Sequence, residues 1–351
     1  MNGRQPALGI VATIPVISLS LAFVHLFTFP VFAGWVSFYM QCTIPMQIIV
    51  GITWQCRQPD FAAKQSQPMK GLLLTLITVM AGIVASVFLL AVPGGNITPP
   101  TPMLLQCTIV SVAVTFWVSI MWGGWPFRAL IRNTVTSGIV QLVACYLLTY
   151  GLFRILFNFE FMKDAPVYVE ALDPHGLFNA WNVLVFIVTA LSIMFLMLHF
   201  DLWPLNKSKA LMKQPVLGVV WTTIALALAA IAYGIGVDTM KIDVVKFLVS
   251  VPIPFIFGTI VTLNMLQGTL FKDRKQPAKG ILSAVTAALI GTGLSWIYQS
   301  LAAIVTGRLH SGPPTYDFEI WLASALLAVT FPLLIVSAVF FEFWPFNQQD
   351  S

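Results

Sequence analysis

The sequence predicts an all-α, polytopic transmembrane bundle of about ten helices, from its composition and from the spacing of its apolar segments. Of the 351 residues, 58% are apolar and only 9% are charged, whereas a typical soluble domain carries roughly 25% charged residues. Long apolar segments alternate with short polar connections along the whole chain. Because so few charged side chains cannot cover a soluble core, lipid is the expected solvent for most of the chain.

Ten segments reach the length of about 20 apolar residues that a helix needs to cross a hydrocarbon core of roughly 30 Å. The expected spans are 8–29, 31–54, 71–91, 104–122, 135–157, 177–200, 216–235, 245–266, 281–305 and 320–341. The division at Pro30 is the least defined, and a re-entrant arrangement there would change the count. We expect the first span to be retained, since it is longer than a usual signal core and lacks a small-residue cleavage pattern.

Lysine and arginine are retained in cytoplasmic connections, and here they are distributed unevenly. The N-terminal tail and the connections after even-numbered spans hold Arg4, Arg57, Lys64, Lys70, Arg128, Arg132, Lys207, Lys209, Lys213, Lys272, Arg274, Lys275 and Lys279. The opposite side holds Arg154, Lys163, Lys241, Lys246 and Arg308. This asymmetry predicts that both termini lie in the cytoplasm.

A short motif, Q-P-x-x-G, recurs four times, each time directly before an apolar run. The copies are 5–9, 67–71, 214–218 and 276–280, and residues 132–138 form a degenerate fifth copy. Proline suits the first turn of a helix, because its φ is already fixed and its missing N–H would have no intrahelical partner. A Trp-Pro pair follows three even-numbered spans, at Trp125-Pro126, Trp203-Pro204 and Trp344-Pro345.

These motifs predict five tandem helical hairpins of one orientation within a single integral membrane domain, 1–351. The approximate hairpin limits are 5–62, 67–128, 132–205, 214–271 and 276–346. A competing symmetry comes from the equal spacing of His25 to Pro30 and of His199 to Pro204, at the ends of spans that run in opposite directions. An inverted repeat of five plus five spans, common in secondary transporters, would produce it. The four motif copies favour the tandem hairpins.

Ionisable side chains are scarce at membrane depth, and no Asp or Glu lies near the centre of any expected span. Four ionisable residues near span ends, His25, Arg154, His199 and Asp201, are expected to reach the headgroups. Proton-coupled carriers usually keep a carboxylate, His or Lys among their helices. Proton coupling is therefore disfavoured.

Helix-breaking residues in the second and eighth spans indicate a substrate path. Pro45 with Gly51 and Pro252 with Gly258 share the spacing P-x5-G, and Pro254 adds a further interruption. Discontinuous helices free backbone groups that can bind solutes, although kinks are also tolerated without function. The expected path residues are Gln41, Thr43, Pro45, Gln47, Gly51, Pro252, Pro254, Gly258 and Asn264.

Signatures of catalysis and of cofactor binding are missing, since the chain has no Walker loop, GxGxxG, HExxH or GxSxG. Its four cysteines, Cys42, Cys56, Cys107 and Cys145, lack CxxC spacing, and its four histidines are far apart in sequence. The acidic outer connection 158–176 has no EF-hand spacing. The net charge of +5 is not concentrated on a hydrophilic face, which argues against nucleic acid. We expect no catalytic residue, no cofactor and no metal.

The architecture favours a transporter or permease for a small, uncharged or weakly charged solute. The alternative is a non-catalytic membrane subunit or scaffold of a larger complex, and a membrane enzyme acting on lipid or quinone is the third hypothesis. The expected partners are the bilayer, a small-molecule substrate, and a second copy or a membrane-complex partner. The expected location is the inner, cytoplasmic membrane of a bacterium.

Overall fold

The computed structural model describes residues 5–347, so Arg4 of the basic count lies outside the described residues. Within them, ten helices are long and apolar enough to cross a membrane, which confirms the predicted number. Numbered as spans 1 to 10, they are Ala7–His25, Phe29–Thr53, Met69–Ala91, Pro102–Met121, Thr134–Leu156, Ala180–His199, Val216–Thr239, Val244–Met265, Ala278–Val305 and Asp317–Phe340. The first division differs from the expected one, because span 1 ends at His25 and Pro30 lies in the first turn of span 2.

Five spans are single α-helices: α1 (Ala7–His25), α5 (Met69–Ala91), α8 (Thr134–Leu156), α9 (Ala180–His199) and α13 (Ala278–Val305). The other five combine α-helix with wider π-helical turns. They contain α2 (Phe29–Val31), η1 (Phe32–Val36), α3 (Ser37–Ile48) and η2 (Ile49–Thr53) in span 2; α6 (Pro102–Phe116) and η3 (Trp117–Met121) in span 4; α10 (Val216–Tyr233) and η7 (Gly234–Thr239) in span 7; α11 (Val244–Ser250), α12 (Pro252–Ile260) and η8 (Val261–Met265) in span 8; and α14 (Asp317–Ala323), η10 (Ser324–Thr330), α15 (Phe331–Ile335) and η11 (Val336–Phe340) in span 10.

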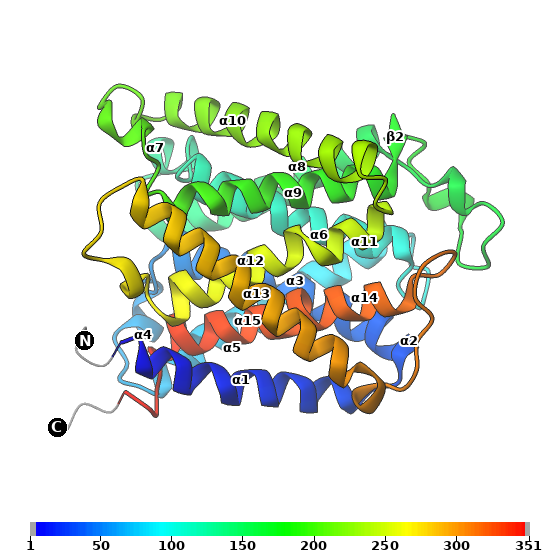
Figure 1. The fold of residues 1–351 in the computed structure, drawn as a ribbon, viewed down its shortest axis with the longest axis horizontal. Coiled ribbons are helices and arrows are strands. Elements are labelled where there is room, and N and C mark those ends of the chain that lie inside the picture. The colour runs from blue at the N-terminus through cyan, green and yellow to red at the C-terminus, as the bar shows by residue number, and fades with distance from the viewer. Residues whose placement is uncertain (1–4, 348–351) are drawn as a thin grey trace.

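Short elements join the spans at both ends of the bundle. Helices α4 (Asp60–Ala63) and α7 (Phe127–Leu130) lie at one end, where odd-numbered spans begin and even-numbered spans end, and we call this the motif end (Figure 1). At the opposite end, strand β1 (Phe157–Asn158) pairs in parallel with β2 (Phe178–Asn179) around the connection between spans 5 and 6. The remaining short turns are the 3₁₀ turns η4 (Glu160–Met162), η5 (Glu170–Leu172), η6 (Leu205–Lys207) and η9 (Thr269–Phe271).

The spans form two rings that differ in burial. In the even-numbered spans, 56–72% of the most apolar window is buried inside the protein, against 22–28% in the odd-numbered spans. Large apolar side chains of the odd-numbered spans, such as Val84, Leu147 and Leu289, are more than half exposed, as expected of residues that face lipid. The even-numbered spans therefore make a central ring, and the odd-numbered spans a peripheral ring around it.

The central ring closes on itself in chain order. Helix α3 of span 2 contacts α6, α6 contacts α9, α9 contacts α11 and α12 of span 8, and span 8 contacts span 10, which returns to α3. Each peripheral span lies between two neighbouring central spans; for example, α5 contacts α3 of span 2 and η11 of span 10. In the same way, α8 contacts spans 4 and 2, α10 contacts spans 6 and 4, α13 contacts spans 8 and 6, and α1 contacts spans 10 and 8.

The Q-P-x-x-G motif joins the two rings through its glutamine. In all four copies the glutamine Oε1 accepts a hydrogen bond of 3.0–3.3 Å from the backbone N–H of the motif glycine, which caps the first turn of the peripheral helix. In three copies Nε2 also donates to a backbone carbonyl at the end of a central span: Gln67 to Phe340, Gln214 to Met121 and Gln276 to His199. Just before the degenerate fifth copy, Arg128 Nη2 donates a hydrogen bond to the backbone carbonyl of Thr53, at the corresponding end of span 2.

The motif glycine allows the two rings to approach closely. A Cβ at Gly71 would lie 2.7 Å from the ring of Phe341, and a Cβ at Gly218 would lie 2.6 Å from the ring of Trp122. Gly9, Gly138 and Gly280 have equally little room against the Met265 carbonyl, the Trp54 indole and the Phe200 ring. All five peripheral spans therefore contact the end of a central span through a glycine at the motif end.

Gly258 of span 8 and Gly291 of span 9 make a second close approach, in which a Cβ on either glycine would clash with the facing backbone. We expect Gly291→Ala to lower the stability by about 1–3 kcal/mol, because overpacking forces the helices apart. The matched control is Gly293→Ala on the same helix, where a Cβ would meet nothing within 4 Å. Thermal unfolding in detergent measures both, and equal melting temperatures for the two variants would contradict the packing described.

Candidate functional site

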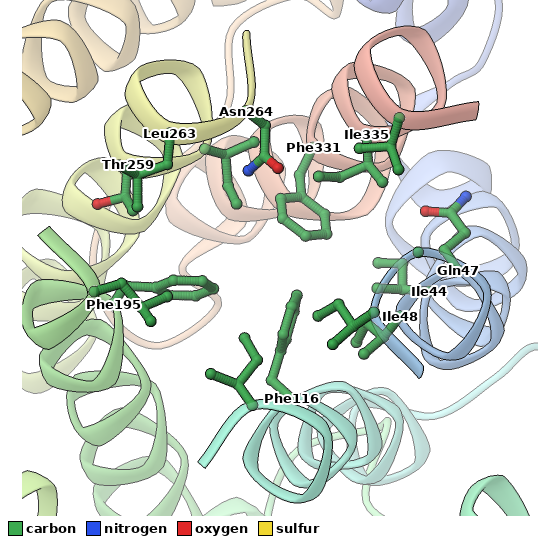
Figure 2. A pocket seen from close by; sticks show the side chains of 16 residues that line it. Ile44, Gln47, Ile48, Phe116, Phe195, Thr259, Leu263, Asn264, Phe331 and Ile335 are labelled. Atoms are coloured by element: carbon green, nitrogen blue, oxygen red, sulfur yellow. The ribbon is translucent and has the colours of Figure 1, made fainter. Parts of the chain in front are cut away.

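A cavity of about 240 Å³ lies on the axis of the central ring, and all five central spans line it. Figure 2 shows the rings of Phe116, Phe195 and Phe331 pointing towards its middle from three different helices. The lining is apolar apart from Gln47, Thr259 and Asn264. The lining residues are Ile44, Gln47, Ile48, Gly51, Ile52, Phe116, Ile120, Phe195, Leu198, Thr259, Ile260, Leu263, Asn264, Phe331, Ile335 and Val339. We call it the large cavity.

The large cavity opens at the motif end of the bundle. In each central span the lining residue nearest that end is partly exposed; these residues are Ile52, Ile120, Leu198, Asn264 and Val339. Four of the five central spans are π-helical at this level, in η2, η3, η8 and η11. A π-helical turn is wider than an α-helical turn and occurs frequently at functional sites.

The opposite end of the large cavity is closed by an aromatic cluster. The ring of Phe116 meets Phe195 at 5.4 Å and Phe331 at 5.9 Å between centroids, with interplanar angles of 73° and 71°. These edge-to-face arrangements are the favoured geometry for aromatic pairs. The three side chains are only 3–6% exposed, so the cluster is buried in the interior of the bundle.

A second cavity, of about 90 Å³, is lined by the other halves of the same five spans. No residue lines both cavities, and the intervening stretches carry buried apolar side chains such as Val188, Leu191 and Ile256. We call it the small cavity. Its lining residues are Ala33, Gln41, Pro102, Leu105, Gln106, Ile109, Trp181, Leu184, Val245, Leu248, Val249, Glu319, Ile320, Ala323 and Ser324.

The polar groups of the small cavity come from spans 2, 4 and 10. Glu319 is 3% exposed and accepts hydrogen bonds from Ser311 Oγ at 2.6 Å and from the backbone N–H of Gly312. Gln41 Oε1 accepts a hydrogen bond of 2.6 Å from Thr108 Oγ1. Gln106 is also 3% exposed, and neither its Nε2 nor its Oε1 has a hydrogen-bond partner among residues 5–347.

The structure separates the nine path residues expected from the sequence into two groups. Gln47, Gly51 and Asn264 line the large cavity, and Gln41 lines the small one. The other five do not line either cavity: Thr43, Pro45, Pro252, Pro254 and Gly258.

The residues outside the cavities have packing roles. Thr43 lies against Gly82 of span 3, and Pro254 and Gly258 lie against span 9. Pro252 begins α12 after a break at Val251, whereas α3 continues through Pro45. The two prolines that share the P-x5-G spacing therefore lie in different local structures, a continuous helix at Pro45 and a helix start at Pro252.

His199 does not reach the headgroups as expected. Its side chain is 1% exposed, with Nδ1 at 2.7 Å from Ser283 Oγ and Nε2 at 3.0 Å from Thr259 Oγ1. The two hydroxyls satisfy both ring nitrogens, so the imidazole joins spans 6, 8 and 9 beside the large cavity.

The aromatic cluster, Gln106 and Glu319 were not anticipated from the sequence. A signal for Gln106 was present, because Gln41-Cys42-Thr43-Ile44 and Gln106-Cys107-Thr108-Ile109 are identical at all four positions. Glu319 precedes the expected start of span 10 and was counted with the outer connection; it is buried because α14 begins at Asp317.

No family model, curated protein or solved structure matches this chain. The function therefore has to be argued from the two cavities. Among residues 5–347 no group of three or more His, Cys, Asp or Glu side chains is placed to hold a metal ion.

Access to the large cavity can be measured with introduced cysteines. We expect Asn264→Cys, which lines the opening, to react with a water-soluble maleimide at least roughly ten times faster than Thr262→Cys, because a thiol in apolar surroundings forms little thiolate. Thr262 is a close control, since it lies two residues away in η8, is 1% exposed and does not line the cavity. The native cysteines are all buried, which keeps the background low. Equal reaction rates would contradict the opening.

Proposed function

We propose that this protein moves a small solute across the membrane along the axis of its central ring. The observation that carries the proposal is that the same five helices line two cavities in succession, with a buried aromatic cluster between their levels. A scaffold subunit does not require an axial cavity, so this arrangement favours transport over the alternative role. The scarcity of carboxylates at mid-span supports a path that is not proton-coupled.

We also propose that the five hairpins are tandem copies of one unit. Each peripheral span contacts a central span through a glycine at the motif end, and four copies share the same glutamine-to-glycine hydrogen bond. Through this glycine, each peripheral span contacts the central span of the hairpin two places earlier in the chain. The count continues from the first hairpin back to the fifth, because the ring is closed. A ring of equivalent units has its only shared space on the axis, which is where both cavities lie.

The proposed orientation has the motif end in the cytoplasm, because most of the basic connections lie there. The large cavity then opens to the cytoplasm and the small cavity faces the outside. A bacterial cytoplasmic membrane remains the predicted location.

The orientation is tested by labelling intact cells with a membrane-impermeant maleimide. Cysteines introduced at Lys207 and Lys272 should be protected until the cells are opened, whereas a cysteine at Lys163, in the connection at the opposite end, should be labelled at once. Labelling of the Lys207 and Lys272 variants from outside would reverse the proposed orientation.

The transport path is tested by opening the aromatic cluster. We expect Phe116→Ala and Phe331→Ala to raise the solute permeability of proteoliposomes by roughly tenfold, which corresponds to about 1.4 kcal/mol of barrier. Stopped-flow light scattering with glycerol, urea, methylammonium and formate measures this permeability. The control is Phe88→Ala on the exposed face of span 3, which should leave it unchanged. If neither cluster variant alters the permeability to any of these solutes, the axial path is excluded.

A further inference from the structure

The small cavity combines one buried carboxylate with two primary amides. Of its 15 lining residues only Gln41, Gln106, Glu319 and Ser324 are polar, and none is Lys or Arg. The large cavity likewise has no Lys or Arg in its lining. The fixed charge along the axis is therefore negative, which attracts cations and repels anions.

Glu319 lies at this cavity without a cationic partner. Its three hydrogen bonds are all donated to it, by a hydroxyl and by one backbone N–H that reaches both oxygens. The nearby cation is Lys246, whose Nζ lies close to Gly312, but no ion pair reaches Glu319 among residues 5–347. A buried carboxylate without a counter-ion is costly, so the cavity favours an occupant that brings positive charge.

Gln106 independently indicates a ligand. Its amide is nine-tenths buried, lines the cavity and has no partner at either atom. Leaving a buried amide unpaired costs free energy that an apolar side chain would avoid. Its Oε1 can accept a hydrogen bond from a solute that enters the cavity.

We infer that the small cavity is a recognition site for a small ammonium-type cation, either ammonium or a primary amine of one or two carbons. Such a cation donates several N–H bonds, which suits the oxygens of Glu319, Gln106 and Gln41. A cavity of about 90 Å³ has room for only a few heavy atoms. Farther along the axis the faces of the aromatic cluster can stabilise a cation that has left water. This inference rests on the axial path proposed above.

The experiment measures uptake of radiolabelled methylammonium into proteoliposomes at pH 6, where the amine is almost entirely protonated, driven by an inside-negative potassium diffusion potential. Urea and formate are measured in parallel. We expect saturable, potential-dependent methylammonium uptake, and a loss of at least roughly tenfold in Glu319→Gln, because the substitution removes the charge but keeps the size. The control Glu170→Gln neutralises an exposed carboxylate in the 157–179 region at the same end of the bundle and should change uptake little.

A second variant tests the same site even if Glu319→Gln does not fold. The side-chain amide of Gln106 has no hydrogen-bond partner among the described residues, so Gln106→Leu removes the proposed ligand group without breaking a hydrogen bond. It should raise the methylammonium concentration needed for half-maximal uptake. If urea or formate crosses while methylammonium does not, or if both variants transport methylammonium like the original protein, the cation site is wrong and the axial path survives. If no solute crosses even in Phe116→Ala, the axial path fails as well.

Discussion

Close contact between the starts of the peripheral helices and the ends of the central helices is the constraint on which the rest of the structure depends. Helix ends leave backbone groups without intrahelical partners, and at the membrane boundary little water is available for them. In three of the four copies the motif glutamine satisfies both sides of the contact, since its oxygen caps its own helix and its nitrogen donates to a carbonyl of the central helix, as Gln214 does with Gly218 and Met121. The glycine removes the Cβ that would hold the two helices apart.

This contact is consistent with the position of the two cavities on the axis. Each peripheral helix fills the groove between two central helices, so the lateral interfaces are closed by side chains and by close backbone packing, as at Gly258 and Gly291. The five central helices form a closed ring around both cavities. The π-helical turns at the motif end of four of them coincide with the large cavity, and the wider turns alter which side chains face the axis there.

The sequence predicted the spans well, because length and apolarity alone determine whether a helix can cross a bilayer. It also contained the Q-P-x-x-G copies, whose glutamines and glycines make the contacts between the rings. It did not distinguish the central from the peripheral spans, because a membrane helix can be apolar on all sides and periodicity then does not mark its buried face. For the same reason Gln47 and Thr43, one helical turn apart, looked equivalent, although only Gln47 lines a cavity. Glu319 was missed because its burial depends on where α14 begins.

The distribution of polar groups along the axis gives the aromatic cluster its physical role. On the proposed path a solute would meet amide or carboxylate groups first, at Gln41, Gln106 and Glu319 from one side and at Gln47 and Asn264 from the other. At the level between them the rings of Phe116, Phe195 and Phe331 belong to the buried apolar core, and Phe116 makes edge-to-face contacts with the other two. Each such pair contributes only about 0.5–1.5 kcal/mol beyond its buried area, so moving one ring aside breaks no hydrogen bond. On the proposed axial path this cluster is the barrier between the two cavities.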